Sequence, residues 1–463
     1  MTIVERVKNR KIGIVGMARS GLAAAKLAAG LGGEVFVSEC KPARQVAEQT
    51  ALLSGLNIGF ETGGHSEQLL ANDYLILSPG VPPTVPILIE AARRGLPMFS
   101  EIEFASWFCR GTIVAITGSN GKTTTTTLIG EIFKAAGRPT FVCGNIGLPF
   151  AEVSSQIPSE GIAVVEVSTF QLERIDVFKP HVAVILNLSP DHLDRHGDYQ
   201  AYKKLKYRIA ENQSAEDRLI LNKQDQDSMS DAIDTAARKL YFTTEADQSA
   251  RSFVRDGVLW VRREDAEVKV IACDAIRIRG PHNLQNAAAA VAVTSELDVA
   301  PESMREALKS FAGVEHRLEL VDRVAGIDFI NDSKATNVDS VSYALRSIDT
   351  PIHLVAGGLG KGASYAPLIE HGRGRIKNII LIGKARQEMF DQLGRHFPTQ
   401  FADSLPEAVR VCFELAQPGE TVLLSPACAS FDMFENYEHR GRMFKQAVAE
   451  LRQSENNAVI EDK

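Results

Sequence analysis

One short segment of this 463-residue sequence has the composition of a loop that binds phosphate. The run TGSNGKTT (117–124) places two glycines, a lysine and several hydroxyl side chains between an apolar run, 112–117, and a predicted helix. The glycines allow a tight turn, and the N–H groups at a helix start attract an anion. Ile116 stands where the strict Walker pattern has glycine, so the loop is a shortened variant. We predict that it binds ATP, with Lys122 on the β- and γ-phosphates and the Thr123 hydroxyl on Mg²⁺.

Two later segments offer ligands for the metal ion that ATP chemistry requires. Glu166 lies within the apolar run IAVVEVS (162–168), where an unpaired carboxylate is costly to bury. The residue therefore either forms a buried salt bridge or binds Mg²⁺. The segment DHLDRH (191–196) places five ionisable groups after a second apolar run, 182–189. Because parallel strands end at one edge of a sheet, we expect both segments to lie beside the phosphate loop.

A second glycine-rich segment, near the N-terminus, leaves three interpretations open. GMARSG (16–21) follows the apolar run KIGIVG (11–16), and Glu39 closes the next apolar run, 18 residues after Gly21. This is close to the G-x-G-x-x-G fingerprint of dinucleotide sites, but Ala18 replaces the middle glycine. The segment is consistent with a turn that binds no ligand, with a nucleotide or UDP-type ligand, or with a nicotinamide cofactor in a dehydrogenase.

The elements that must position these residues follow an α/β pattern. Short apolar runs rich in β-branched residues alternate with helical patterns, which predicts parallel sheets, and at roughly 150 residues per domain the length fits three domains. We predict a Rossmann-like N-terminal domain over residues 1–105, a central P-loop ATPase-type α/β domain over 106–313 and a Rossmann-like C-terminal domain over 314–463. Between 240 and 279, short alternating runs predict a small antiparallel insertion before a helix near His282.

The charge and cysteine content exclude several classes of protein. With 51 basic and 58 acidic residues the net charge is −7, and no strongly basic tract offers the phosphate neutralisation that nucleic-acid binding requires. The six cysteines are scattered and form no CxxC pair, so we expect reduced thiols rather than disulfides or a zinc site. The chain has neither an apolar signal core nor an uncharged apolar stretch of about 18 residues. We therefore expect a cytosolic protein, with no nucleic-acid partner and no membrane insertion.

The motifs, taken together, resemble those of the ATP-dependent Mur ligases, which build the peptide of the bacterial cell-wall precursor. The resemblance covers essentially the whole chain. Its markers are TGSNGKTTT (117–125), GNIG (144–147), EVSTFQLE (166–173), NLSPDHLDRH (187–196), YKKLKYRIAEN (202–212), GPHNLQNAAAA (280–290), EHRLE (315–319), NDSKATN (331–337) and LSPACASFDMFENYEHRG (424–441).

Two of these markers, NDSKATN and SPACASFD, resemble the corresponding motifs of the family members that add D-glutamate. The D-N-P-R motif of the diaminopimelate- or lysine-adding members is absent, as is the His-His-Pro of the L-alanine-adding one. Folylpolyglutamate synthetases share the phosphate loop but should lack the N-terminal UDP-binding domain. The resemblance thus favours D-glutamate as the amino acid.

The resemblance implies an ADP-forming ligase of peptidoglycan synthesis, and hence of cell shape and division; we expect it to act as a monomer. ATP would phosphorylate the terminal carboxylate of UDP-N-acetylmuramoyl-L-alanine, the amine of D-glutamate would attack the acyl phosphate, and a tetrahedral intermediate would expel phosphate. Because all three substrates are anions, the site needs dense positive charge and oriented donors.

The resemblance also implies roles for individual residues. Thr123 and Glu166 would hold one of two Mg²⁺ ions, and His192 would hold the other together with a carbamate formed from CO₂ on Lys206. Without the resemblance, Lys206 belongs to a solvated basic helix face. The residues implied for ATP are Gly118, Ser119, Asn120, Gly121, Lys122, Thr123, Thr124, Asn283, Asn286, Arg317, Asp332 and Lys334. Those implied for the UDP substrate and D-glutamate are Arg19, Ser20, Ser78, Gly80, Asn145, Thr169, His192, Lys334, Thr336, Lys361, Ser430, Phe431 and Tyr437.

Overall fold

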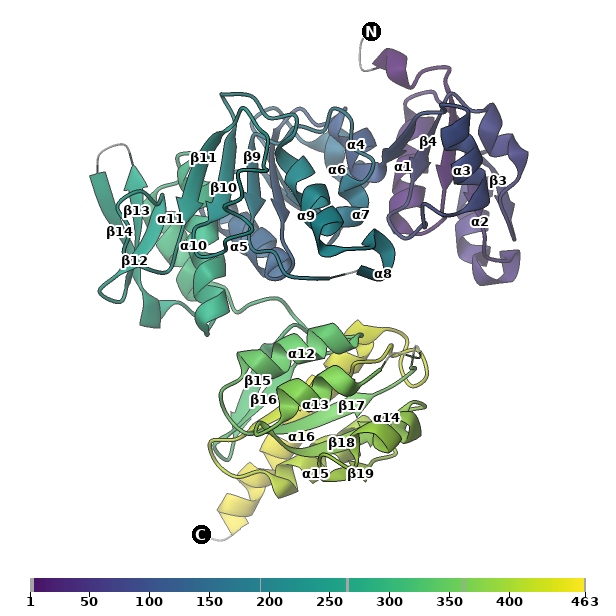
Figure 1. Ribbon diagram of the computed structural model, residues 1–463. Helices are drawn as coiled ribbons and strands as arrows, with labels where there is room; N and C mark the ends of the chain where they lie inside the picture. Colours follow the sequence, from purple (N-terminus) through teal and green to yellow (C-terminus); the bar gives the residue numbers. More distant parts are fainter. Residues whose placement is uncertain (1–3, 192, 264–265, 361, 363, 462–463) are drawn as a thin grey trace. The chain divides into compact units, whose positions relative to one another are not determined.

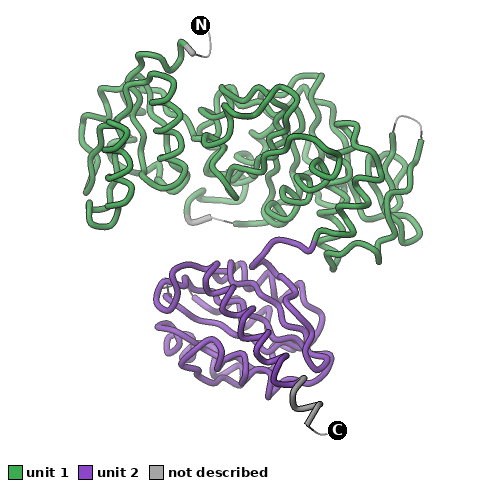
Figure 2. The backbone as a smooth tube through the Cα atoms, turned by 180° about the vertical axis from the view of Figure 1, so that it is seen from behind, with its two compact units in different colours: residues 1–311 green, residues 312–463 purple. Residues whose placement is uncertain are grey.

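The computed structural model of the chain describes residues 4–191, 193–263, 266–360, 362 and 364–461. The chain divides into two compact units, unit 1 over residues 1–311 and unit 2 over residues 312–463 (Figure 2). Unit 1 contains two β-sheets and unit 2 contains a third (Figure 1). All three are mostly parallel, with helices between successive strands, which confirms the predicted α/β class. Among the described residues, no helix is both long and apolar enough to cross a membrane.

The first sheet of unit 1 has five parallel strands in the order β3-β2-β1-β4-β5. Its elements are β1 (Lys11–Val15), α1 (Arg19–Gly30), β2 (Glu34–Glu39), α2 (Ala47–Gly55), β3 (Gly59–Thr62), β4 (Tyr74–Leu77), α3 (Pro86–Arg93), β5 (Met98–Ser100) and α4 (Glu101–Ser106). The strand order reverses between β1 and β4, which are paired neighbours. The turns that follow these two strands therefore lie side by side, where open α/β sheets bind their ligands.

The second sheet of unit 1 has nine strands in the order β14-β13-β12-β11-β10-β9-β6-β8-β7. The strands are β6 (Thr112–Thr117), β7 (Thr140–Gly144), β8 (Ile162–Glu166), β9 (Val182–Ile185), β10 (Arg218–Asn222), β11 (Arg238–Phe242), β12 (Ser252–Arg255), β13 (Val258–Arg263) and β14 (Ala266–Ala272). The helices are α5 (Lys122–Ala135), α6 (Phe150–Val153), α7 (Thr169–Leu172), α8 (Leu193–His196), α9 (Tyr199–Tyr207), α10 (Pro281–Ser295) and α11 (Pro301–Ser310). β8 and β9 are buried over their whole length, as expected for apolar strands covered on both faces.

The predicted antiparallel strands are present before α10, over residues 252–272, but they extend the central sheet, and the first strand of the predicted range is parallel. β11 lies parallel to β10, and β12 joins β11 at the pair formed by Phe242 and Ser252. Only β12, β13 and β14 pair in antiparallel fashion, as an extension of the same sheet. Helix α10 covers this extension too, since the Ser252 hydroxyl donates a hydrogen bond to the Ala288 carbonyl at 2.6 Å. Alternating residues indicate pairing but do not identify the partner strand.

A buried carboxylate links the two sheets of unit 1. Glu103 in α4, which follows the first sheet, is fully buried. Its oxygens accept hydrogen bonds from the Trp107 indole N–H and from the three successive N–H groups of residues 176–178, at 2.6–3.1 Å. One apolar core also runs from the first sheet to the central one, through Ile14, Phe104 and other buried side chains. The two sheets therefore form one compact unit.

Unit 2 has a six-stranded sheet in the order β15-β16-β20-β17-β18-β19, in which only the β15–β16 pair is antiparallel. Its strands are β15 (Glu319–Val324), β16 (Ile327–Asn331), β17 (Ile352–Gly357), β18 (Ile376–Ile382), β19 (Thr399–Phe401) and β20 (Thr421–Leu424). Its helices are α12 (Val338–Ser347), α13 (Ala366–Gly372), α14 (Arg386–Leu393), α15 (Leu405–Leu415) and α16 (Tyr437–Glu461). Because β16 pairs with β20, the motifs NDSKATN and SPACASFD leave neighbouring strands.

Replacing Glu103 with alanine is expected to lower the free energy of unfolding of unit 1 by about 3 kcal/mol, because four donors, two of them buried, lose their shared acceptor. Chemical denaturation followed by tryptophan fluorescence measures the change. The matched control is Glu152→Ala, which removes an exposed carboxylate on α6 and should change stability by less than about 0.5 kcal/mol. Equal stabilities of the two variants would contradict the role assigned to Glu103.

Candidate functional site

Residues 118–121 form the turn between β6 and α5, as predicted for a phosphate loop. Gly118 and Gly121 have φ angles of +151° and +79°, a backbone conformation that side chains disfavour. A Cβ atom on Gly121 would clash with Oδ1 of Asn286, and one on Gly118 would lie 3.0 Å from Cβ of Leu186. Both glycines are therefore needed for the backbone to turn and for the neighbouring segments to pack against it.

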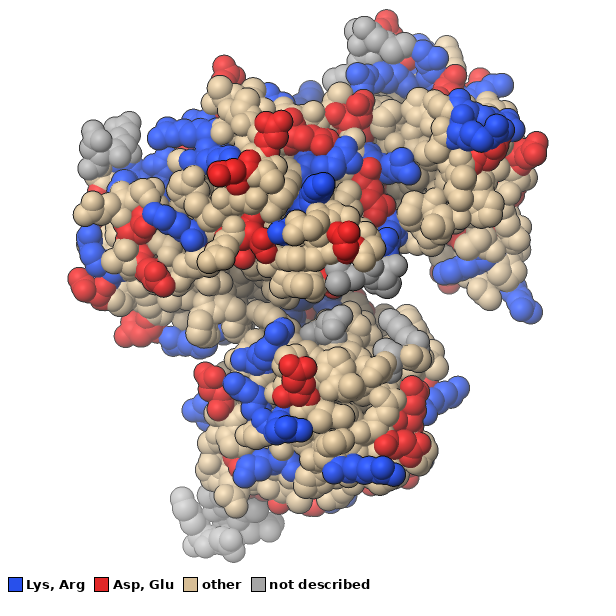
Figure 3. Space-filling model, viewed as in Figure 1, with Lys and Arg blue, Asp and Glu red and all other residues tan. Residues whose placement is uncertain are grey.

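Two lysine ammonium groups converge on this loop. Nζ of Lys122, the first residue of α5, donates to the carbonyls of Gly118 at 2.7 Å and Ser119 at 2.8 Å. Nζ of Lys206, on α9, donates to the same Gly118 carbonyl at 2.8 Å. On the face shown in Figure 3, by contrast, basic side chains are interspersed with acidic ones. The phosphate loop thus concentrates positive charge where an anion would bind.

Lys206 is only 2% exposed, so its interpretation as part of a solvated helix face is wrong. Burial, and secondly the nearby charge of Lys122, lower the pKa of the Lys206 ammonium well below its usual range. A lowered pKa favours the neutral amine, which is the form that reacts with CO₂. The helix-face interpretation does describe the exposed Lys204, whereas Lys203 pairs with Asp227 at 2.6 Å.

Glu166, at the end of β8, is buried between two neutral donors. Its Oε2 accepts a hydrogen bond from the Thr123 hydroxyl and its Oε1 accepts one from Nδ2 of Asn145, both at 2.8 Å. Neither donor is a cation, but Glu166 also interacts electrostatically with Lys206, so the metal ligand stays a prediction beside the buried salt bridge. A hydroxyl and a carboxylate are oxygen donors of the kind that Mg²⁺ prefers. The pair Thr123–Glu166 therefore fits a magnesium site beside the phosphate loop.

One of the two asparagines predicted to contact the adenine, Asn286, lies directly against Gly121 of the phosphate loop. Oδ1 of the buried Asn286 accepts a hydrogen bond from the Thr125 hydroxyl at 3.1 Å. Nδ2 of Asn286 donates to Oδ1 of Asn283 at 3.1 Å, one helical turn away on α10. The structure brings this pair together and orients it, while its contact with adenine stays a prediction.

The segment 191–196 contains structural residues as well as the predicted ligand His192, which lies outside the described residues. Arg195 pairs with Glu173 at 2.9 Å and donates to the carbonyls of residues 79 and 81, in the loop after β4. Nε2 of His196 lies 3.0 Å from the Thr169 hydroxyl. These two basic residues therefore attach the segment to its surroundings within unit 1.

The residues predicted to bind UDP lie at the switch point of the first sheet, Arg19 and Ser20 at the start of α1 and Ser78 and Gly80 in the loop after β4. The guanidinium of Arg19, at the start of α1, donates to the carbonyl of Gly147 in the GNIG segment. The buried Ser78 hydroxyl donates to the Gly16 carbonyl at 3.3 Å. The turn after β1 is thus tied both to the loop after β4 and to the segment that carries Asn145.

Glu39, the acid of the dinucleotide fingerprint, supports the turn after β1. Its carboxylate accepts hydrogen bonds from the N–H groups of Met17 at 2.8 Å and Lys41 at 3.0 Å. Although burial acts to raise it, these bonds hold the pKa of Glu39 below its usual value. In a dinucleotide site the corresponding acid binds the ribose. Here it is engaged by the backbone, which does not favour the dehydrogenase interpretation.

Asp332, directly after β16, is a buried acid of unit 2. Its Oδ2 accepts a hydrogen bond from the Ser425 hydroxyl at 2.8 Å, and its Oδ1 accepts the N–H of Leu318 at 3.2 Å. Burial raises the pKa of Asp332 to about 7, against the opposing effects of these bonds and of the positive charge of Arg317. The carboxyl group therefore changes its charge near neutral pH.

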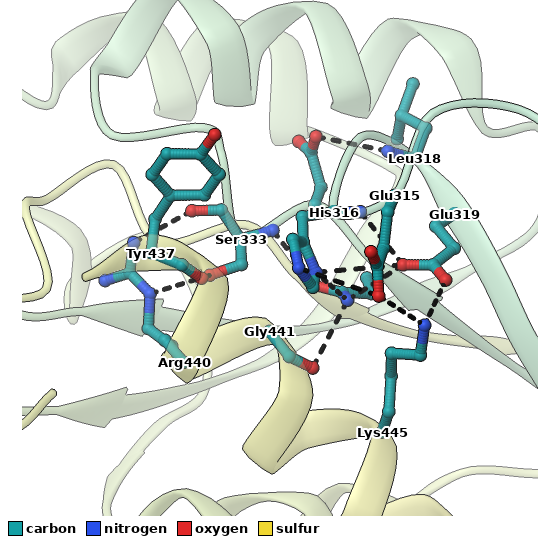
Figure 4. A network of polar contacts seen from close by, with 11 residues as sticks. Glu315, His316, Leu318, Glu319, Ser333, Tyr437, Arg440, Gly441 and Lys445 are labelled. Carbon is teal, nitrogen blue, oxygen red and sulfur yellow. Dashed lines mark hydrogen bonds and ion pairs between the residues drawn. The ribbon is translucent and has the colours of Figure 1, made fainter. Parts of the chain in front are cut away.

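Arg440, on α16, is fully buried, and it is not among the residues predicted from the sequence. Its guanidinium donates to the Ser333 hydroxyl at 3.0 Å and to the Ser333 carbonyl at 2.9 Å (Figure 4). It also donates to the Cys428 carbonyl at 3.2 Å. The Ser333 hydroxyl in turn donates to the Tyr437 carbonyl at 2.8 Å. Arg440 thus joins the loops after β16 and β20 to the start of α16. The Arg-Gly pair that ends the marker 424–441 was the signal available in the sequence.

The remaining predicted residues of unit 2 lie on the two loops that follow β16 and β20: Lys334, Thr336, Ser430 and Phe431. Ser430 is buried, whereas Phe431 is 70% exposed. Nζ of Lys334 lies 5.9 Å from the ring centroid of Tyr437. Lys361, predicted to bind D-glutamate, lies outside the described residues.

Three family models match the chain: the MurD N-terminal domain over residues 11–87, the Mur ligase middle domain over 116–294, and the Mur ligase glutamate ligase domain over 316–428. Two of the most similar relatives are both named UDP-N-acetylmuramoylalanine–D-glutamate ligase. The Salinibacter ruber protein is 42% identical over 96% of this chain and 99% of its own length. The Koribacter versatilis protein is 40% identical over 97% of this chain and 99% of its own length.

Solved structures share the fold. UDP-N-acetylmuramate–alanine ligase MurC from Thermotoga maritima has a TM-score of 0.56 at 19% identity. The match covers 96% of this chain and 100% of that chain. MurF from Acinetobacter baumannii has a TM-score of 0.56 at 18% identity, covering 98% of this chain and 93% of that one. At this level of identity the likeness establishes the fold alone.

The buried Asp332 is expected to make the stability of unit 2 fall as the pH rises. An unfolded aspartate titrates near pH 3.9, and the folded pKa is about 7. Between these two pKa values Asp332 is protonated in the folded state and ionised in the unfolded state. The contribution to stability is therefore complete below the unfolded pKa and is lost as the pH rises to the folded pKa. Asp332→Asn should remove this loss, which amounts to a few kcal/mol.

Hydrogen exchange of the β16 and β20 peptides at acidic, neutral and mildly alkaline pH measures this dependence. Asp349→Asn, which changes an exposed carboxylate of the same unit, is the control and should retain the wild-type profile. Parallel profiles for the wild type and Asp332→Asn would show that Asp332 does not titrate in this range.

Proposed function

This chain belongs to the Mur ligase family, and we propose that it adds D-glutamate to UDP-N-acetylmuramoyl-L-alanine in an ATP-dependent, ADP-forming reaction of peptidoglycan precursor synthesis. The observation that carries the proposal is the identity of 40–42% over nearly the whole chain with relatives named as D-glutamate ligases. The match of the first sheet to the MurD N-terminal domain model supports the same member of the family.

Unit 1 supplies the groups proposed to act on ATP. The N–H groups of the phosphate loop and the start of α5 would receive the triphosphate, and Lys122 would exchange its two carbonyl partners for phosphate oxygens. Thr123 and Glu166 would hold Mg²⁺, which when bound neutralises charge on the transferring phosphoryl group. Further residues proposed for ATP are Gly118, Ser119, Asn120, Gly121, Thr124, Asn283, Asn286 and, from unit 2, Arg317, Asp332 and Lys334.

The carboxylate of the UDP substrate would attack the γ-phosphorus of ATP, with ADP leaving. The amine of D-glutamate would then attack the acyl carbon, and the C–O bond to phosphate would break. Asn145, held by Glu166, would orient the reacting carboxylate. Other residues proposed for the UDP substrate are Arg19, Ser20, Ser78, Gly80, Thr169 and His192. Those proposed for D-glutamate are Lys334, Thr336, Lys361, Ser430, Phe431 and Tyr437.

A second Mg²⁺, bound by His192 and a carbamate on Lys206, belongs to the proposal as well. Its support is the burial of the Lys206 amine at the phosphate loop, since an ammonium there would repel a metal ion while a carbamate offers two oxygens. We also propose that the enzyme acts as a monomer, because one chain supplies the phosphate loop and the ligands of the first metal. The use of ATP and a nucleotide sugar supports a cytoplasmic location.

The proposed reaction is tested by ATP-dependent phosphate release with UDP-N-acetylmuramoyl-L-alanine and a panel of D- and L-amino acids. We expect release with D-glutamate. Lys122→Ala should lower turnover by at least about 100-fold, because one contact to the transition-state charge is lost. Lys134→Ala, which removes an exposed lysine from the same helix, should leave it unchanged. Turnover with L-alanine or diaminopimelate instead of D-glutamate would overturn the assignment, and near-wild-type turnover of Lys122→Ala would refute the role of the loop.

Lys206→Ala is expected to be nearly inactive and to be partly rescued by added acetate or formate, whose carboxylates can take the place of the carbamate. Lys204→Ala, which removes an exposed lysine from the same helix, is the control and should retain full activity. ¹³C NMR after labelling with bicarbonate should show a carbamate signal that Lys206→Ala lacks. The absence of both this signal and any rescue would contradict the carbamate.

A further inference from the structure

One side chain that the proposed reaction does not use, Asn187, joins the segment after β9 to the phosphate loop. Its Oδ1 accepts a hydrogen bond from the backbone N–H of Asn120 at 2.8 Å, and its Nδ2 donates to the backbone carbonyl of the same residue at 3.1 Å. Its own carbonyl accepts the N–H of Ser119 at 2.9 Å. Asn187 therefore satisfies three main-chain groups within two successive residues of the loop.

A second pair of contacts runs between the same two segments. The Ser119 hydroxyl donates to the carbonyl of Ser189 and accepts the N–H of Ser189, both at 2.9 Å, and it lies 2.8 Å from the hydroxyl of Tyr202. The bonds run in both directions between the segments. The loop therefore cannot slide along the segment without breaking several hydrogen bonds at once.

The segment 186–189 is itself held from its other side by the end of β10. Nδ2 of the buried Asn222 donates to the carbonyl of Leu186 at 3.0 Å. The carboxylate of Asp225 accepts the N–H of Leu188 at 3.0 Å. Because its backbone is fixed at both neighbouring residues, the carboxamide of Asn187 acts as a rigid support and not as a mobile side chain.

We propose that Asn187 is a positioning residue for the nucleotide, which holds the backbone of the phosphate loop in its receptive shape before ATP arrives. The inference rests on the proposed function, in which residues 118–124 bind ATP. The carbonyls of Gly118 and Ser119, which accept Lys122, belong to the same backbone. A loop that is already ordered pays no ordering cost on binding. Without Asn187, ATP binding must itself order the loop, and the entropy lost in doing so decreases ATP affinity.

The experiment measures ATP binding and loop order in the full chain with Asn187→Ala. Isothermal titration with ATP and Mg²⁺ should give a Kd raised about tenfold, because two hydrogen bonds that order the loop are lost. The KM for UDP-N-acetylmuramoyl-L-alanine should not change. Hydrogen exchange of the peptide covering 117–124, measured without nucleotide, should be faster than in the wild type.

A matched control removes the same kind of support elsewhere in unit 1. Nδ2 of Asn212 donates to the backbone carbonyls of Asp176 at 2.8 Å and Phe178 at 3.2 Å. Asn212→Ala should therefore lower the melting temperature without changing the ATP Kd or the exchange of the 117–124 peptide. Asn187→Asp keeps the side-chain size and the acceptor for the Asn120 N–H, but loses the donor to the Asn120 carbonyl. Asn187→Asp should raise the ATP Kd and speed the exchange of the 117–124 peptide, as Asn187→Ala does. If Asn187→Ala fails to fold, Asn187→Asp alone provides the test.

Wild-type ATP affinity and wild-type exchange in an Asn187 variant would overturn the positioning role. An equal loss of ATP affinity in Asn212→Ala would also overturn it, because the effect would then follow global stability. Failure of the proposed ligase reaction is distinguishable, since it shows as a lack of phosphate release by the wild type with D-glutamate. The ATP Kd and the exchange rates are read without the amino acid.

Discussion

Two ammonium groups, from Lys122 and Lys206, donate to the single carbonyl oxygen of Gly118. Like charges repel, and the repulsion is larger in a buried site than in water. Burial first and this repulsion second lower the pKa of Lys206. The repulsion is relieved either by an anion at the loop or by loss of charge from Lys206. Both are what the proposed reaction requires, because it brings a triphosphate to the loop and a carbamate to Lys206.

The parallel sheet is what brings the other groups to these lysines. β6 pairs with β8 on one side and with β9 on the other, so Ile116 is opposite Glu166, and Thr117 is opposite Ile185. The segments that follow these strands therefore start at the same edge of the sheet, and they contact one another there. Glu166 accepts a hydrogen bond from the Thr123 hydroxyl, and Asn187 accepts one from the N–H of Asn120. The loop, the proposed metal ligand and the supporting asparagine are thus far apart in the sequence, but they follow paired strands and lie side by side in the fold.

Unit 2 uses the same arrangement with a different kind of support. The loops after the paired strands β16 and β20 carry four of the six residues proposed for D-glutamate. Arg440 fixes both loops by donating to main-chain carbonyls and to the Ser333 hydroxyl. In each unit, polar side chains that are buried or half-buried therefore bind backbone groups, which leaves the neighbouring loop residues oriented. In both units, a loop proposed to bind a ligand is ordered by neighbouring residues before the ligand binds.

Much of the fold and the centre of the site could be predicted from the sequence, because their signals are local. The glycines, Lys122 and Thr123 are adjacent in the chain, and the apolar runs marked most of the core strands correctly. Contacts between segments that are distant in the sequence leave no such local signal. Lys206 has the sequence context of a solvated helix face, and only the tertiary structure buries it, against a carbonyl 88 residues earlier.

The roles of Glu39, Arg440 and Asn187 were likewise decided by tertiary structure. Arg440 and Ser333 are 107 residues apart, and Asn187 and Asn120 are 67 apart. The sequence by itself determined the α/β class, the phosphate loop and the family, since turn geometry and hydrophobic periodicity act over a few residues. The tertiary structure alone decided which polar side chains support that loop, because a buried polar group must find its partner wherever the folded chain places one.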